Sequence, residues 1–540
     1  MVRIRYWLVF GLFLSCFGAM ATAAGLNEPD ARRFLSQATF GPTEASTAEV
    51  MASGRTSWLQ KQFANAATDY KGFAYMDPNP KVGCPVGAVA TCRRDNYSLF
   101  PLQVEFFQHA LTAEDQLRQR VALALSEILV ASGQRIRQPY AMANYQRIFL
   151  SNAFGNFKDI LHAVTLSPAM GNFLNMVNND KPNPVRGTVP NENYAREVLQ
   201  LFSIGLWQLN PDGSLKLDGS GTPIPTYSQD TVEGFAHIFT GWTYSPRAGA
   251  TSKFPNPENY DGQMVGFEAH HDTGSKLLLN GLVEPSGKSQ VADLEAGISS
   301  IFNHPNVGPF IGRRLIQQMV TSNPSPAYIA RVSAAFNGST GAPRGDMKAT
   351  ITAVLADPES SQPQKPFAFG NLREPIVQLA HLFRILGGHS DGVWLVGQAN
   401  VMGEPVFSPP TVFNFFSPDN PLPDDPMLDG PAFGIYNATT AFAYSGAISE
   451  ALSSKGIAAD ASVPGSTGSR IDFSKWQTLA TDSKKLVKEI DRVLFGERMS
   501  PSLGSILQTA AESQPASNPL GRVHAALYLA LISPEYLVEH

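Results

Sequence analysis

The segment NENYAREVLQLF (residues 191–202) brings acids, amides and a guanidinium to one side of an expected helix. On a helical wheel one arc holds only polar residues, and apolar residues fill the remainder. The residues of this arc are Glu192, Asn193, Arg196, Glu197 and Gln200. Two carboxylates beside an arginine could supply a general acid, a general base and a site for negative charge. A solvated helix face and a buried network that ties helices together are the structural alternatives.

A second polar group lies in the segment HHDTGSK, which begins at His270. If this segment is a loop, two of its first three side chains could converge and complete a site with the helix face. The alternative is a turn in which Asp272 accepts hydrogen bonds from backbone N–H groups. The predicted catalytic residues are Glu192, Arg196, Glu197, His271 and Asp272, and the predicted substrate contacts are Asn193, His270, Lys276 and Trp242.

A metal site would need at least three converging ligands. The expected helix 230–239 carries Asp230, Glu233 and His237 on one face, and these could join the HHD segment around zinc or another divalent ion. Packing roles are the alternative, with Asp230 as a helix N-cap and His237 as a satisfied packing residue. A divalent metal is therefore the one cofactor that the sequence suggests, and no ligand is assigned to it.

Other polar and aromatic residues have ordinary explanations. Arg313 and Arg314 could attract an anion, but such pairs are usually solvated, and Glu374 before Pro375 fits the first turn of a helix. Trp207 and the phenylalanines between 413 and 416 could stack on sugars, although aromatic side chains more often pack in a core. No serine-hydrolase elbow and no CxxC motif is present in the sequence.

Helical periodicity dominates the elements that must position these groups. The clearest predicted helices cover residues 115–130, 308–320, 373–386, 483–495 and 521–532. Alternating strand patterns are scarce, so we predict a mainly α fold: a single large helical domain with long ordered loops rich in proline and glycine. We expect the helical core over residues 24–452, a flexible joint at 453–475, and C-terminal helices at 476–540 that pack on the same domain.

The composition suits a large buried core, with 43% hydrophobic and 16% charged residues. The formal net charge is -5 and there is no basic block, so we expect no binding to nucleic acid. Arg3 and Arg5 precede an apolar run, and an A-x-A pattern ends at Ala23, which is typical of a secretory signal peptide over residues 1–23. A membrane anchor and a lipoprotein signal at Cys16 are less favoured alternatives.

Cleavage of this peptide would leave an exported protein, periplasmic or extracellular, without a membrane span. Its two remaining cysteines, Cys84 and Cys92, flank a loop that contains glycine and proline. We expect them to form a disulfide, since exported proteins meet an oxidising environment.

Several long motifs, in order along the chain, resemble those of a bacterial exported family, domain of unknown function 1800. They are ARRFLSQATFGPT (31–43), PNENYAREVLQLFSIGLWQLNPDG (190–213), YSQDTVEGFAHIFTGW (227–242), HHDTGSKLLLNG (270–281), HPNVGPFIGRRLIQQMV (304–320), LREPIVQLAHLFRILGG (372–388) and MGEPVFSPPTVFNFFSPD (402–419). The resemblance implies an exported, mostly helical domain and assigns no reaction. It also implies that the E-N-Y-A-R-E core matters, whereas the arginine common at position 237 in the family counts against His237 as an essential ligand.

Two hypotheses about function follow. The first is an exported hydrolase- or lyase-type enzyme that acts on a polymeric or anionic substrate through the Glu/Arg/Glu helix face. The second is a non-catalytic scaffold that binds surface glycan or another exported protein. The resemblance suggests a partner for it, because family members are often encoded beside the sulfatase-like domain of unknown function 1501 family.

Overall fold

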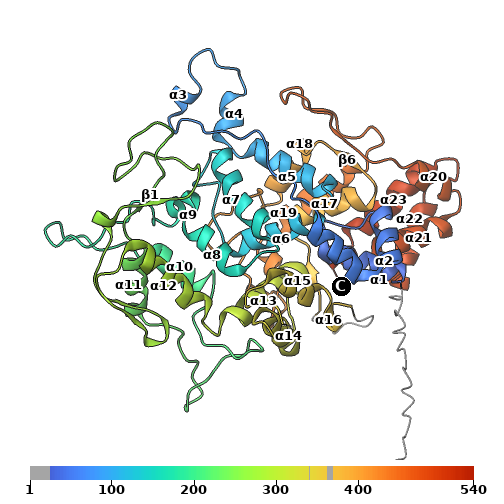
Figure 1. Ribbon diagram of the computed structural model, residues 1–540. Coiled ribbons are helices and arrows are strands. Elements are labelled where there is room, and N and C mark those ends of the chain that lie inside the picture. Colours follow the sequence, from blue (N-terminus) through green and yellow to red (C-terminus); the bar gives the residue numbers. More distant parts are fainter. Residues whose placement is uncertain (1–24, 340, 362–368, 540) are drawn as a thin grey trace, which may run out of the picture.

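The computed structural model describes residues 25–339, 341–361 and 369–539. Within these residues the chain forms twenty-four α-helices, and its strands pair only as five two-stranded antiparallel sheets (Figure 1). The prediction of a mainly α domain is therefore confirmed. The predicted signal peptide, residues 1–23, lies outside the described residues. Among the described helices, none combines the length and the apolar character that a membrane span requires.

The helices of the first half of the chain often begin at a proline or at a side-chain cap. Ser228, for example, accepts a hydrogen bond from the Thr231 amide at the start of α11. These helices are α1 (Glu28–Ala38), α2 (Glu44–Ala64), α3 (Pro80–Gly83), α4 (Cys92–Tyr97), α5 (Phe100–Thr112), α6 (Gln116–Ile128), α7 (Pro139–Asn152), α8 (Phe157–Thr165), α9 (Pro168–Phe173), α10 (Asn193–Gln200), α11 (Gln229–Ile238) and α12 (Gln290–Phe302).

The second half of the chain supplies the remaining helices. These are α13 (Val307–Met319), α14 (Pro326–Phe336), α15 (Met347–Leu355), α16 (Pro358–Ser361), α17 (Pro375–Ile385), α18 (Val393–Val401), α19 (Ala438–Ala451), α20 (Ser474–Leu479), α21 (Ser483–Ile490), α22 (Pro501–Glu512), α23 (Pro519–Ile532) and α24 (Pro534–Leu537). A π-helical turn, Asp491–Phe495, continues α21.

The strands are short and fasten loops to the helical body. They are β1 (Trp242–Thr243), β2 (Val265–Gly266), β3 (Lys276–Leu277), β4 (Val283–Glu284), β5 (Asn371–Leu372), β6 (His389–Ser390), β7 (Pro421–Leu422), β8 (Asp425–Asp429), β9 (Ser469–Arg470) and β10 (Val538–Glu539). The C-terminal strand β10 pairs with β5, which places Glu539 opposite Asn371. The end of the chain is therefore fixed next to the start of α17.

One buried apolar cluster extends from Ala31 near the N-terminus to Leu537 near the C-terminus. Helix α6 lies inside this core and packs against α2, α5, α7 and α13 (Figure 1). Nearly all of its residues are buried, including Arg120 and Glu127. A helix that is buried on all sides normally carries apolar side chains, so these two charged residues need a specific reason to be there.

Helices α17 and α18 pack against each other and against α5. Glu374 immediately precedes α17 with an extended backbone, as expected before a proline. After α18 the chain turns through Gly403, whose φ of 87° is readily adopted only by glycine. This turn returns the chain towards the start of α17, where an Oε2 atom of Glu404 accepts a hydrogen bond from the Ile376 amide at 2.8 Å.

The segment 453–475 contains β9 and the first residues of α20. β9 pairs with β6, and Asp391 accepts hydrogen bonds from Ser466, Thr467 and Gly468. The C-terminal helices that follow share the main apolar core, and α23 packs against α19.

Cys84 and Cys92 form the predicted disulfide, with a Cα–Cα distance of 5.9 Å. The bond closes the short loop between α3 and α4, where Val86 and Val89 are exposed. It acts on this loop alone, because the sequence separation is only 8 residues.

Candidate metal centre

The predicted helix face is largely a surface network between α10 and α11. Arg196 Nη2 lies 2.8 Å from Glu192 Oε2, and these side chains are 41% and 32% exposed. Gln229 of α11 joins both, because it donates to Glu192 at 2.9 Å and accepts from Arg196 at 3.1 Å. Asn193 is the first residue of α10, and its amide donates to the Asn191 side chain. These contacts fit a solvated structural link between two helices.

Glu197 differs from the rest of this face. It is half-buried, and its Oε2 atom accepts no hydrogen bond. Burial raises the pKa of Glu197, although Arg196 opposes the shift. The Tyr227 hydroxyl nearby is also without a partner, and burial raises its pKa to about 12. Glu197 therefore lies in a partly desolvated environment beside Tyr227.

The HHD segment sends its three side chains to three different partners. His270 Nδ1 lies 3.0 Å from Asp180 Oδ2, while the ring stacks on Phe254 with a centroid distance of 3.8 Å. Asp272 contacts His237 and accepts a hydrogen bond from the Gly274 amide at 2.7 Å. Partial burial opposes ionisation of Asp272, but the Gly274 amide and His237 outweigh it and lower its pKa.

His271 belongs to a buried polar triad. Its Nε2 atom lies 2.8 Å from Asp293 Oδ2 of α12, and Lys276 Nζ lies 2.6 Å from the same oxygen. All three side chains are almost fully buried, so the triad fastens the loop to α12. Trp242, predicted as a substrate contact, is buried in β1.

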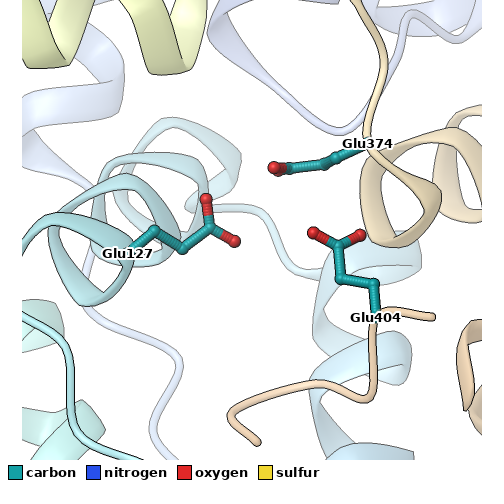
Figure 2. A group of neighbouring side chains, drawn as sticks. All are labelled: Glu127, Glu374 and Glu404. Atoms are coloured by element: carbon teal, nitrogen blue, oxygen red, sulfur yellow. The ribbon is translucent and has the colours of Figure 1, made fainter. Parts of the chain in front are cut away.

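A different group of carboxylates converges in the core. Glu127 at the end of α6, Glu374 before α17 and Glu404 after α18 point their carboxyl groups towards one another (Figure 2). One oxygen from each lies within 4.8 Å of the other two. Among the residues that the structure describes, this is the only set of three histidine, cysteine or acidic side chains with such convergence. Asp230, Glu233, His237 and the HHD segment do not form one.

The three carboxylates are buried and short of hydrogen-bond donors. Glu127, Glu374 and Glu404 are 8%, 6% and 0% exposed. Both oxygens of Glu127 accept no hydrogen bond, and neither does Oε1 of Glu374 or Oε1 of Glu404. Gln318 and Glu374 lie close enough to Glu127 to influence its ionisation. Their distances and angles to it do not satisfy those of a hydrogen bond. Buried polar oxygens normally have partners, so this cluster has unused capacity to bind a ligand.

The electrostatics of the cluster disfavour three bare negative charges. Burial and then the charge of Glu374 raise the pKa of Glu127 well above its usual range, although Arg120 opposes this. Burial and then the charges of Glu374 and Glu127 do the same to Glu404. Burial likewise raises the pKa of Glu374, against the effect of Arg120. Without a cation the cluster therefore retains protons that exposed carboxylates would lose.

Arg120 is the cation of α6 next to the cluster. Its Nη1 atom lies 4.0 Å from Glu374 Oε1, and Nη2 donates to the Gln318 carbonyl. Three ionised carboxylates and one arginine leave a net charge of about −2, which is the charge that a divalent cation offsets. Oxygen-only ligands suit Mg²⁺, Mn²⁺ or Ca²⁺. Oxygens bound to Ca²⁺ at about 2.4 Å lie at most about 5 Å apart, so the observed spacing fits such an ion.

Two members of the cluster line a cavity of about 420 Å³. Glu127 and Glu374 line this cavity, whereas Glu404 lies behind them in the core. Arg313 and Arg314 of α13 form part of another wall, and Gln200 reaches the cavity from the C-terminal end of α10. A ligand in the cavity could therefore reach two of the three carboxylates.

Sequence reasoning missed Glu127 and Glu404, and it interpreted Glu374 as a first-turn helix residue. The structure places Glu374 just before the first turn of α17, where it makes no capping bond. A signal was available, because Glu127 interrupts the apolar run VALALSEILV, and the other two occur as Glu-Pro directly before apolar residues in LREPIV and MGEPVF. Burying an acid among apolar residues is unfavourable unless it is paired or binds a ligand, so such an acid is a candidate for a functional site.

Comparison with known proteins gives a family and no closer relative. No curated protein and no solved structure matches the chain. A family described as "Protein of unknown function (DUF1800)" matches residues 33–538, which include all three carboxylates and every residue that lines the cavity except Glu539. The chain therefore belongs to the DUF1800 family, as its motifs suggested.

Proposed function

We propose that this DUF1800 protein is a metal-dependent enzyme of the hydrolase or lyase type, with its active centre where the cavity meets Glu127, Glu374 and Glu404. The observation that carries the proposal is the convergence of three buried carboxylates, with oxygens that lack donors, two of which line a cavity. Perturbed acids in a concave site are typical of catalytic centres.

A purely structural role accounts poorly for this arrangement. Burying a carboxylate is unfavourable unless it is paired or hydrogen-bonded, and here one arginine faces three acids. The buried triad of His271, Lys276 and Asp293 illustrates the structural case, because there one acid has two basic partners. In the glutamate cluster the acids outnumber their basic partner, which suits a site whose charge is balanced by a metal cation.

Such a cation would act as a Lewis acid on a substrate oxygen or lower the pKa of a bound water. Side chains and backbone groups of the protein would hold and orient this ion. The three glutamates would hold the ion, Arg120 would limit the negative charge, and the Ile376 amide would orient Glu404. In this account Glu192 and Arg196 link two helices, and α10 contributes to the site through Gln200 at its other end.

The test is a measurement of cation binding by the purified chain. After treatment with a chelator, Mn²⁺, Ca²⁺ and Mg²⁺ are titrated calorimetrically, and bound metal is quantified by mass spectrometry. We expect one site per chain, with an affinity that rises with pH because binding must displace protons. Glu127→Gln, Glu374→Gln and Glu404→Gln should each abolish it, while the surface control Glu192→Gln should not.

Activity is then screened against esters and polymers with and without the preferred cation. Turnover that needs the cation and the three glutamates would support the enzyme. An unmodified chain that binds no divalent cation, or variants that bind it as well as the original, would refute the proposed centre.

A further inference from the structure

The outer part of the cavity is lined by large apolar side chains that remain exposed. Trp207 and Phe413 line it and are 41% and 51% exposed, and Leu206 and Leu215 are similarly open. They come from two segments far apart in the sequence, one after α10 and one after α18. Exposed apolar side chains that gather at one cavity are typical of a ligand site, whereas single exposed ones are common on protein surfaces.

Hydrogen bonds from the body of the protein fix the backbone of the segment after α10. The buried Asn306 donates hydrogen bonds to the carbonyls of Ile204 and Trp207, each at 2.8 Å, and accepts one from the Leu209 amide at 2.9 Å. Trp207 also forms an isolated antiparallel β-bridge with Pro225. On the other side the Phe413 amide donates to Thr411 Oγ1 at 3.1 Å. The Trp207 ring is therefore carried on fixed backbone, which lowers the entropy lost on binding.

The two arginines that α13 contributes to the cavity wall are already paired with acids. Arg314 makes two hydrogen bonds to Asp419, at 3.0 and 2.8 Å. Arg313 lies 2.7 Å from Asp429, so neither arginine of α13 offers an uncompensated positive charge. Asn371 and Gln200 add uncharged polar groups to the lining. This wall suits a ligand rich in hydroxyl groups better than a polyanion or a plain hydrocarbon.

Building on the proposed function, we infer that the cavity binds a short stretch of uncharged saccharide chain. The apolar faces of its rings would stack on Trp207 and Phe413, and its hydroxyls would hydrogen-bond to the paired Arg–Asp groups. The cavity volume of about 420 Å³ falls within the roughly 300–1,000 Å³ of small-ligand sites. Only a few rings would enter, and they would bring an oxygen of the chain towards the glutamate cluster.

The test uses the purified full chain and a panel of neutral oligosaccharides, including β-1,4-linked hexasaccharides of glucose, mannose, xylose and N-acetylglucosamine. Binding is measured by calorimetry and by quenching of tryptophan fluorescence. Trp207→Ala and Phe413→Ala should each weaken binding about tenfold or more, and Trp207→Ala should remove the quenching. Phe442→Ala is the matched control, because Phe442 is 78% exposed on α19 and does not line the cavity.

Two further arms separate this inference from the metal centre and from other ligands. Glu404→Gln should retain saccharide binding while it loses the cation, because Glu404 does not line the cavity, so each proposal can fail alone. The far-ultraviolet circular dichroism spectrum of Trp207→Ala shows that this variant is folded. The saccharide inference is overturned if no neutral oligosaccharide binds, or if hexagalacturonate binds at least tenfold more tightly. It is also overturned if dodecanoate is the only probe whose binding depends on Trp207.

Discussion

Replacing Glu404 with glutamine is expected to stabilise the metal-free protein and to remove its response to cations. Glu404 is fully buried, with Oε2 bonded to the Ile376 amide and Oε1 without a donor. Glutamine has nearly the same shape and keeps an oxygen acceptor for that amide. It removes one of three clustered negative charges and also one of three ligands. The metal-free protein should therefore become more stable, whereas cation binding should be lost.

The sign and the pH dependence follow from proton linkage, and the size is the general one for removing an uncompensated buried charge. Burial, and then the charges of Glu374 and Glu127, raise the pKa of Glu404 above its ordinary 4.5. An acid whose pKa is raised by folding favours the folded state below its unfolded pKa, and this contribution is lost as pH rises from about 4.5 through the folded pKa. A tenfold change in proton affinity equals about 1.4 kcal/mol. We expect Glu404→Gln to raise the free energy of unfolding by about 1–3 kcal/mol at pH 8 and by little at pH 4.5.

Scanning calorimetry measures this difference. The unfolding entropy of a chain of 540 residues is about 1.1 kcal/mol/K, so the Tm should rise by about 1–3 °C at pH 8. A cation at one hundred times its Kd should stabilise the unmodified chain by about 2.7 kcal/mol, or roughly 2–3 °C, and should leave Glu404→Gln unchanged. A metal-free variant that is less stable at pH 8, or that keeps the full cation response, would refute the reasoning.

Three further substitutions test other parts of the account. Arg120→Met leaves the glutamates without their neighbouring guanidinium group. The free energy of unfolding of the metal-free protein should therefore fall by about 3–5 kcal/mol at pH 8 and by less at pH 5. Equal losses by calorimetry at both pH values would contradict this. Asp293→Asn breaks the buried triad with His271 and Lys276. It should lower the free energy of unfolding by about 3–5 kcal/mol in denaturant titrations and leave the number of bound cations unchanged. A variant that folds but binds no cation would contradict the separation of the triad from the glutamate cluster. Arg196→Ala removes an exposed pair and should change the free energy of unfolding by less than about 1 kcal/mol, a limit that chemical denaturation can test.

The helices were predictable from the sequence because apolar periodicity is local. The predicted helix 308–320 corresponds to α13 (Val307–Met319), and 373–386 corresponds to α17 (Pro375–Ile385). The disulfide was predictable for the same reason, since its two cysteines are neighbours in sequence. The strongly two-sided α10 is also present, with Tyr194 and Val198 on its buried side.

The glutamate cluster was not predictable by the same means. Glu127 belongs to one helix, and Glu374 and Glu404 flank two others far along the chain. Periodicity indicates which side of a helix is apolar, but it does not say which distant residue faces it. The local sequence therefore favours Glu192 and Glu197, because their polar neighbours are close to them along the chain. A search for single acids inside apolar runs would have selected the core residues instead.

The central claim is that Glu127, Glu374 and Glu404 together hold one divalent cation. A crystal structure of the chain grown or soaked with Mn²⁺, with anomalous diffraction data, tests it directly. We predict one strong anomalous peak between the three carboxylates, with manganese–oxygen distances of roughly 2.1–2.3 Å, and no such peak for Glu404→Gln. A fully soaked crystal in which this position shows no peak, or in which the three carboxyl groups bond only to one another, would contradict the claim.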